Sequence, residues 1–133
     1  MYLTVAPYGA HVTATDVLWS GVPLVTSIHS PKFTSRVAGS LLTELRIPEL
    51  IGNSWQEYED IAVRLATDKN FYKFIRNKVE QNRDATEAFD TRSWIKHFES
   101  SLEIMWENHL AGKPPRDIIM SKETPKSSVK DEL

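Results

Sequence analysis

The chain has 133 residues, 41% of them hydrophobic and 26% charged, with a formal net charge of −2. This balance is that of one ordinary globular domain and excludes a disordered or fibrous protein. It provides no basic field, so we expect neither a nucleic-acid nor a membrane partner. Without cysteine the chain has no disulfide, thiolate nucleophile or zinc–thiolate site, and four dispersed histidines favour no metal site, so we expect no metal.

The first half of the chain predicts alternating strands and helices. Residues 2–9 begin as a short β-rich run, residues 12–20 have a helical pattern, and "PLVTSI" at residues 23–28 is a second strand candidate. Residues 32–46 predict a helix, and "PELIGN" is a short extended segment that turns at Gly52. Tight strand–helix–strand connections indicate an α/β fold with helices covering a parallel sheet. The apolar face of the second helix would contain Phe33, Val37, Leu41, Leu42 and Leu45.

Three more helices follow in the second half. Ser54 and Glu57 have the spacing of a capping box at the first, residues 69–83 form the second, and Asp90 caps the last and longest, which Gly112 ends. Their tryptophans and other aromatic residues recur at helical spacing, which favours core packing over sugar stacking. We place a domain boundary after residue 112, with a polar flexible tail over residues 113–133.

The stretch "GAHVTATD", residues 9–16, lies where the first strand gives way to the first helix. A helix N-terminus presents unpaired amides and the positive end of the helix dipole, which suit a phosphate. Asp16, one turn into the helix, can accept hydrogen bonds from two sugar hydroxyls. The alternatives are that His11 only caps the turn, and that Thr13 and Asp16 are ordinary residues of a helix N-terminus.

The chain resembles the C-terminal end of the O-GlcNAc transferases, which transfer N-acetylglucosamine from UDP-GlcNAc to serine and threonine of intracellular proteins. The resemblance runs from about Leu3 to about Pro115, through "PYGAHVTATDVLWSGVPLVT", "FTSRVAGSLL", "PELI", "QEYEDIAVRLATD", "FDT" and "MWENHLAG". It implies the C-terminal portion of the second Rossmann-like lobe of a GT-B enzyme, followed by helices. The first lobe and the helical repeats of the family have no counterpart in this sequence.

The resemblance also implies a donor site. The family's motif, close to H-T-T-x-x-D, corresponds to His11, Val12, Thr13 and Asp16, so these four residues would bind the UDP-sugar donor. Val12 departs from the usual threonine, and Thr4 stands where aspartate is common. No catalytic residue, cofactor or metal is expected in this chain, because the family residues proposed to act at the acceptor hydroxyl lie upstream.

The sequence is therefore interpreted as a fragment of a protein O-GlcNAc transferase that contributes the UDP-sugar-binding corner, with acceptor proteins bound through upstream regions. The alternative is a non-catalytic, truncated remnant or interaction module that keeps the fold. The resemblance implies a cytoplasmic or nuclear location. The C-terminal "KDEL" is a retrieval address for the endoplasmic reticulum, but the N-terminus lacks the pattern of a signal peptide.

Overall fold

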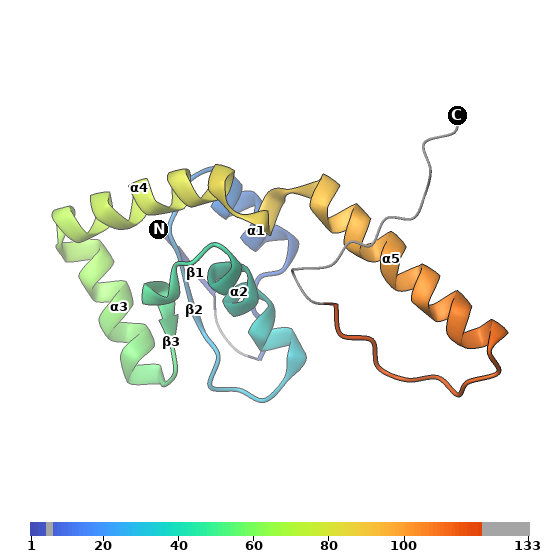
Figure 1. The fold of residues 1–133 in the computed structure, drawn as a ribbon. Coiled ribbons are helices and arrows are strands. Elements are labelled where there is room, and N and C mark those ends of the chain that lie inside the picture. The colour runs from blue at the N-terminus through green and yellow to red at the C-terminus, as the bar shows by residue number, and fades with distance from the viewer. Residues whose placement is uncertain (5–6, 121–133) are drawn as a thin grey trace. The chain divides into compact units, whose positions relative to one another are not determined.

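The computed structural model describes residues 1–4 and 7–120, so the "KDEL" segment lies outside the described residues (Figure 1). The chain forms two compact units, Met1–Phe89 and a second that begins at Asp90, and each is described by itself. The boundary that the sequence places after residue 112 stays a prediction. The helix before it ends at Leu110, whereas the two units divide after Phe89.

The first unit contains a parallel sheet of three short strands, which confirms the predicted α/β class. Its strands are β1 (Tyr2–Leu3), β2 (Leu24–Ser27) and β3 (Ile51–Gly52), with β2 in the centre. Tyr2 pairs with Leu24 and Thr26 pairs with Ile51, both in parallel register. Since parallel strands need crossover connections, α1 (Val12–Trp19) joins β1 to β2 and α2 (Phe33–Glu44) lies between β2 and β3.

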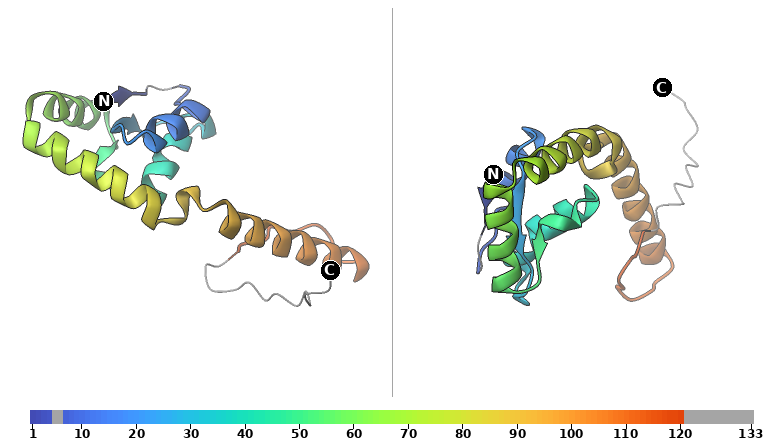
Figure 2. Two further views of the ribbon diagram at one scale, coloured as in Figure 1. Left: turned by 90° about the horizontal axis from the view of Figure 1, so that it is seen from above. Right: turned by 90° about the vertical axis from the view of Figure 1, so that its left-hand side faces the viewer.

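The core lies between the sheet and the helices of this unit. A 3₁₀ turn (Pro48–Leu50) precedes β3, and α3 (Trp55–Thr67) and α4 (Lys69–Ala85) form a helical hairpin, seen from two further directions in Figure 2. A second 3₁₀ turn (Glu87–Phe89) ends the unit. Its larger fully buried apolar side chains come from α1, β2, α2, the segment up to β3, and α4: Leu18, Leu24, Val25, Leu42, Leu45, Ile47, Leu50, Ile75 and Val79.

The predicted helix starts are confirmed by the side chains that cap them. The Glu57 amide donates to the Ser54 hydroxyl over 3.1 Å, while the Glu57 carboxylate accepts from the amide of Asn53 over 2.7 Å. The carboxylate of the box therefore satisfies the amide one residue before the cap. Asp90 accepts from the Ser93 amide over 3.1 Å at the start of α5 (Thr91–Leu110).

Several aromatic side chains that the sequence assigns to the core are exposed. Phe33, expected on the apolar face of α2, is 77% exposed because it occupies the first turn of the helix, ahead of the buried Ala38 and Leu42. All four tryptophans, Trp19, Trp55, Trp94 and Trp106, are at least half exposed. The predicted helices that carry these tryptophans are confirmed, but the prediction that the tryptophan rings pack in a core was wrong.

Candidate functional site

The loop before α1 is fastened to the start of α2. The Gly9 amide and the His11 Nε2 both donate to the carbonyl oxygen of Thr34, over 2.9 and 3.0 Å. The Thr34 hydroxyl in turn donates to the carbonyl of Pro7 over 2.9 Å. Three hydrogen bonds to one residue therefore set the path of residues 7–11 and the direction in which α1 begins.

The imidazole of His11 is held on both of its nitrogens. Because a carbonyl oxygen can only accept, the bond to Thr34 places a proton on Nε2. The Nδ1 of the neutral ring then accepts from the Tyr8 hydroxyl over 3.2 Å, and the two rings are stacked with centroids 4.4 Å apart. Phe33 meets the other side of the imidazole edge-on at 6.3 Å. His11 occupies the N-cap position of α1, but its side chain makes no capping hydrogen bond to that helix. Its ring bonds to Tyr8 and Thr34 instead, and whether His11 also contacts the donor stays a prediction.

The N-terminus of α1 opens on a hollow of about 370 Å³. Nine residues from β1, the following loop and the first turn of α1 line it, among them His11, Val12 and Thr13. The amides of Ala14 and Thr15 bond to the carbonyl of His11, whereas those of Val12 and Thr13 have no acceptor among the described residues. The hydroxyl of Thr13 is likewise free of hydrogen bonds within that part of the chain and lies on an exposed residue. The corner thus presents two amides and one hydroxyl to the hollow.

Asp16 lies just outside the lining of this hollow. It follows Val12 and Thr13 by four and three residues, so all three lie on one side of α1. Its residue is exposed, and within the described residues its carboxylate has neither a hydrogen bond nor an ion pair. The structure therefore brings the four predicted site residues into one turn and a half of the chain. Their role as donor ligands stays a prediction.

The sequence predicts no role for Tyr8 or Thr34, and it singles out Thr4 only because aspartate is common at that position in the family. Tyr8 and Thr34 orient His11, yet Thr34 lies 23 residues away in the sequence and no spacing rule connects the two. Thr4 lines the hollow and is buried, and its hydroxyl donates to that of Thr26 over 2.9 Å. An aspartate at this position would lie against that buried hydroxyl, so the departure changes the polarity of the floor of the hollow.

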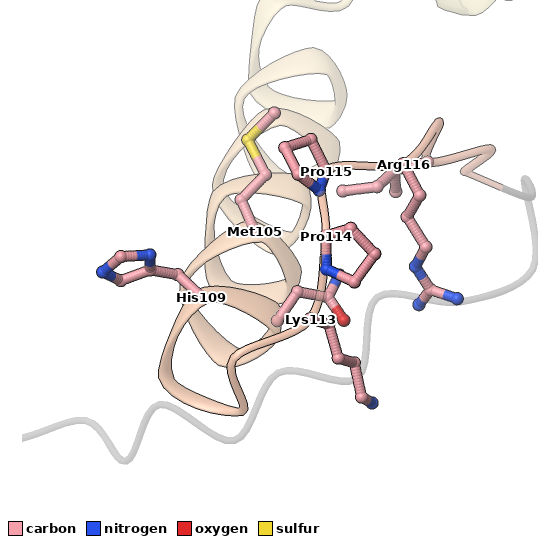
Figure 3. A pocket seen from close by; sticks show the side chains of 8 residues that line it. Met105, His109, Lys113, Pro114, Pro115 and Arg116 are labelled. Carbon is pink, nitrogen blue, oxygen red and sulfur yellow. The ribbon is translucent and has the colours of Figure 1, made fainter.

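Three other hollows among the described residues are lined by none of the predicted site residues. One of about 250 Å³ lies in the second unit, between the end of α5 and the segment that follows, and Met105, His109 and Pro115 line it (Figure 3). The C-terminal end of α5 carries the negative end of the helix dipole, which disfavours binding of an anion in this hollow. A hollow of about 580 Å³ between Met1 and the α3–α4 hairpin is lined by Lys69, Lys73 and Arg76.

Residues 1–4 and 7–120 contain neither a metal-binding cluster nor a helix that could cross a membrane. Across these residues, no three histidine or carboxylate side chains lie close enough together to hold a metal ion. No helix in the same part of the chain combines the length and hydropathy that a bilayer crossing requires.

A parallel sheet with a helix N-terminus at the end of its first strand is the architecture of a nucleotide-binding α/β lobe. The structure resembles a variant of the O-GlcNAc transferase of Thermobaculum terrenum, with a TM-score of 0.76 and 27% sequence identity. The likeness covers 83% of this chain and 21% of that chain. It confirms the predicted class, the C-terminal portion of a GT-B, Rossmann-like lobe followed by helices.

The chain belongs to glycosyl transferase family 41, whose sequence pattern matches residues 4–98. It is 39% identical over 115 residues to the UDP-N-acetylglucosamine–peptide N-acetylglucosaminyltransferase of Caenorhabditis elegans, covering 86% of this chain and 10% of that protein. It is also 39% identical over 107 residues to the probable enzyme SEC of Arabidopsis thaliana, covering 80% and 11% respectively. The chain therefore spans about a tenth of the length of these relatives.

Proposed function

We propose that the first unit is the donor-binding corner of a protein O-GlcNAc transferase, and that it takes the diphosphate of UDP-GlcNAc at the start of α1. The observation that carries the proposal is the hollow in front of the unpaired amides of Val12 and Thr13. Amides that point at a bound anion need no reorganisation, which is why helix N-termini favour phosphates. Membership of the family supports UDP-GlcNAc as the nucleotide sugar in this proposal.

The four site residues have different roles in this proposal. The amides of Val12 and Thr13 and the Thr13 hydroxyl donate to phosphate oxygens, and the Asp16 carboxylate accepts from ribose hydroxyls. Both nitrogens of His11 are occupied by protein partners, so His11 is a positioning residue that fixes the loop leading into α1. In a complete enzyme the corner would also stabilise the charge that develops on UDP as it leaves.

The chain alone is not expected to transfer sugar. No lysine or arginine lines the hollow among the described residues, and no catalytic residue is assigned to the chain. The acceptor protein and the cytoplasmic or nuclear location are part of the same proposal and rest on family membership. No resident cofactor or metal is proposed.

The test is binding of UDP to the 133-residue chain, followed by amide hydrogen exchange. UDP is expected to slow exchange at Ala10 to Asp16 and nowhere else in the first unit. Asp16→Ala should lower the affinity for UDP and leave the affinity for inorganic pyrophosphate unchanged. The control Glu59→Ala, which removes an exposed carboxylate on α3, should change neither affinity.

A nucleotide that lacks both ribose hydroxyls makes the assay specific for the role of Asp16. The natural chain should prefer UDP to 2′,3′-dideoxy-UDP, and Asp16→Ala should abolish that preference. The absence of any protection at millimolar UDP would refute donor binding by this chain and favour a remnant that keeps only the fold.

A further inference from the structure

Tyr8 is an exposed aromatic residue whose ring is nevertheless held in place. It is 63% exposed, yet its ring is stacked on that of His11, with centroids 4.4 Å apart and planes inclined by 26°. Its hydroxyl also bonds to the Nδ1 of His11 over 3.2 Å. Fixing an exposed side chain costs conformational entropy and adds little stability in return. The same arrangement is what a pre-organised binding surface requires.

The side chain that supports Tyr8 is itself fixed from the start of α2. His11 donates through Nε2 to the Thr34 carbonyl, and Phe33 meets the imidazole edge-on with centroids 6.3 Å apart. One face of the Tyr8 ring is therefore covered by His11. The other face contacts no further aromatic ring among the described residues, and Tyr8 is part of the lining of the hollow in front of α1. That face is available to a ligand in the hollow.

The position of Asp16 indicates which part of the donor reaches Tyr8. In the proposed function, on which this inference rests, the amides of Val12 and Thr13 bind the diphosphate and Asp16 binds the ribose. Asp16 lies along α1 and outside the lining of the hollow, so the nucleoside extends away from the hollow. Tyr8 lies in the loop that precedes these amides and lines the hollow. The group on the second phosphate, which is the sugar, therefore faces Tyr8.

The lining of the hollow suits a sugar ring as well as a phosphate. Beside the amides at the start of α1, it includes the side chains of Tyr2, Leu3 and Tyr8, which offer a phosphate no positive charge. A pyranose ring presents C–H groups on its faces, and such groups pack on the electron-rich face of an aromatic ring. We propose that Tyr8 is the platform on which the sugar of the donor stacks, and that it makes the corner prefer a UDP-sugar to UDP.

Two substitutions at Tyr8, made in the full 133-residue chain, isolate the contribution of the ring. Tyr8→Phe and Tyr8→Ala both lack the hydroxyl that bonds to His11, and only Tyr8→Ala also lacks the ring. The affinities of each variant for UDP-GlcNAc and for UDP are measured by titration calorimetry, and their ratio is compared. The ratio should be about fivefold higher in Tyr8→Phe than in Tyr8→Ala, as for one aromatic contact.

The use of a ratio removes two other effects of these substitutions. A general loosening of the loop before α1 lowers both affinities alike, and the different charges of UDP and UDP-GlcNAc are the same in both variants. Phe74→Ala is the matched control, because Phe74 is an aromatic residue of α4 that is 56% exposed and lines none of the hollows described above. It should leave the ratio at the value of the natural chain.

Proton NMR of the ligand tests the stacking on the natural chain, without any substitution. Protons above the face of an aromatic ring resonate upfield of their usual positions. When the chain is added to UDP-GlcNAc, the C–H protons of the sugar ring should therefore shift upfield, and the uracil protons should shift less. Tyr8→Phe should preserve the shift of the sugar protons, and Tyr8→Ala should remove it.

The possible failures of the platform and of the donor site are distinguishable. If UDP binds but the affinity ratio is the same in Tyr8→Phe and Tyr8→Ala, the platform is refuted and the donor site stands. If the uracil protons shift upfield instead of the sugar protons, the ring lies under the nucleobase, which also overturns the inference. If neither UDP nor UDP-GlcNAc binds at millimolar concentration, the donor site is refuted together with the platform.

Discussion

Replacing His11 by phenylalanine separates a positioning role of this side chain from direct contact with the donor. The substitution keeps an aromatic ring between Tyr8 and Phe33 but removes the hydrogen bonds to Thr34 and to the Tyr8 hydroxyl. The Thr34 carbonyl still accepts from the Gly9 amide at 2.9 Å, so no buried oxygen is orphaned.

The expected loss of stability follows from those two bonds. Tyr8 is 63% exposed, so water replaces its lost partner, and each bond is worth about 1 kcal/mol at most. We therefore expect His11→Phe to lower the free energy of unfolding by roughly 1–2 kcal/mol. Urea denaturation followed by tryptophan fluorescence measures this, with UDP affinity measured on the same samples.

Thr34→Val is the matched control, because it removes a different bond from the same loop. Its hydroxyl donates to the Pro7 carbonyl over 2.9 Å and does not touch His11. If His11 acts by holding the loop, the two variants should lose UDP affinity in proportion to the stability each loses. A much larger affinity loss in His11→Phe, at equal stability, would refute the reasoning and place the imidazole on the phosphate.

Three more predictions concern backbone contact, capping and the hollow. Gly52→Ala should cost about 1–3 kcal/mol in unfolding experiments, because an added Cβ would lie 2.7 Å from a backbone nitrogen of α3, whereas Gly9→Ala, at 3.4 Å, should cost far less. Ser54→Ala should remove about 1 kcal/mol by uncapping α3, and Ser40→Ala, on an exposed helix face, almost nothing. Val12→Thr should raise the affinity for UDP about fivefold, the equivalent of one hydrogen bond, while Val12→Ala should not raise it. Equal affinities of the two variants in titration calorimetry would contradict a phosphate at this position.

The order of strands and helices could be predicted because its signals are local. Turn residues, β-branched runs and caps such as Ser54 and Asp90 act within a few residues, and they fixed the helix starts correctly. Burial could not be predicted in the same way. Helical spacing shows which residues share a face but not whether another element covers that face, and α5 and Phe33 are exposed for that reason.

The candidate site was predictable in position and not in detail. His11, Val12, Thr13 and Asp16 are neighbours in the sequence, so any helix start at residue 12 brings them together. The contact that orients His11 comes from α2, 23 residues later, and is set by how that helix packs rather than by any local pattern. Sequence patterns therefore identified the turn that carries the candidate site but missed Thr34, the residue that orients His11.

The charge of the hollow limits what this corner can do by itself. Its lining among the described residues consists of aromatic, apolar and hydroxyl side chains with one histidine, whose ring nitrogens are both engaged. A diphosphate placed there would meet amide dipoles but no full positive charge, and dipoles alone offset only part of its desolvation. We therefore expect UDP to bind this chain weakly, with a dissociation constant of about 1 mM. If a full-length relative binds UDP much more tightly, the difference in affinity measures what cationic side chains outside this segment contribute. If this chain already matched the full-length affinity, the amides of α1 would suffice and no cationic contribution from outside the segment would be needed.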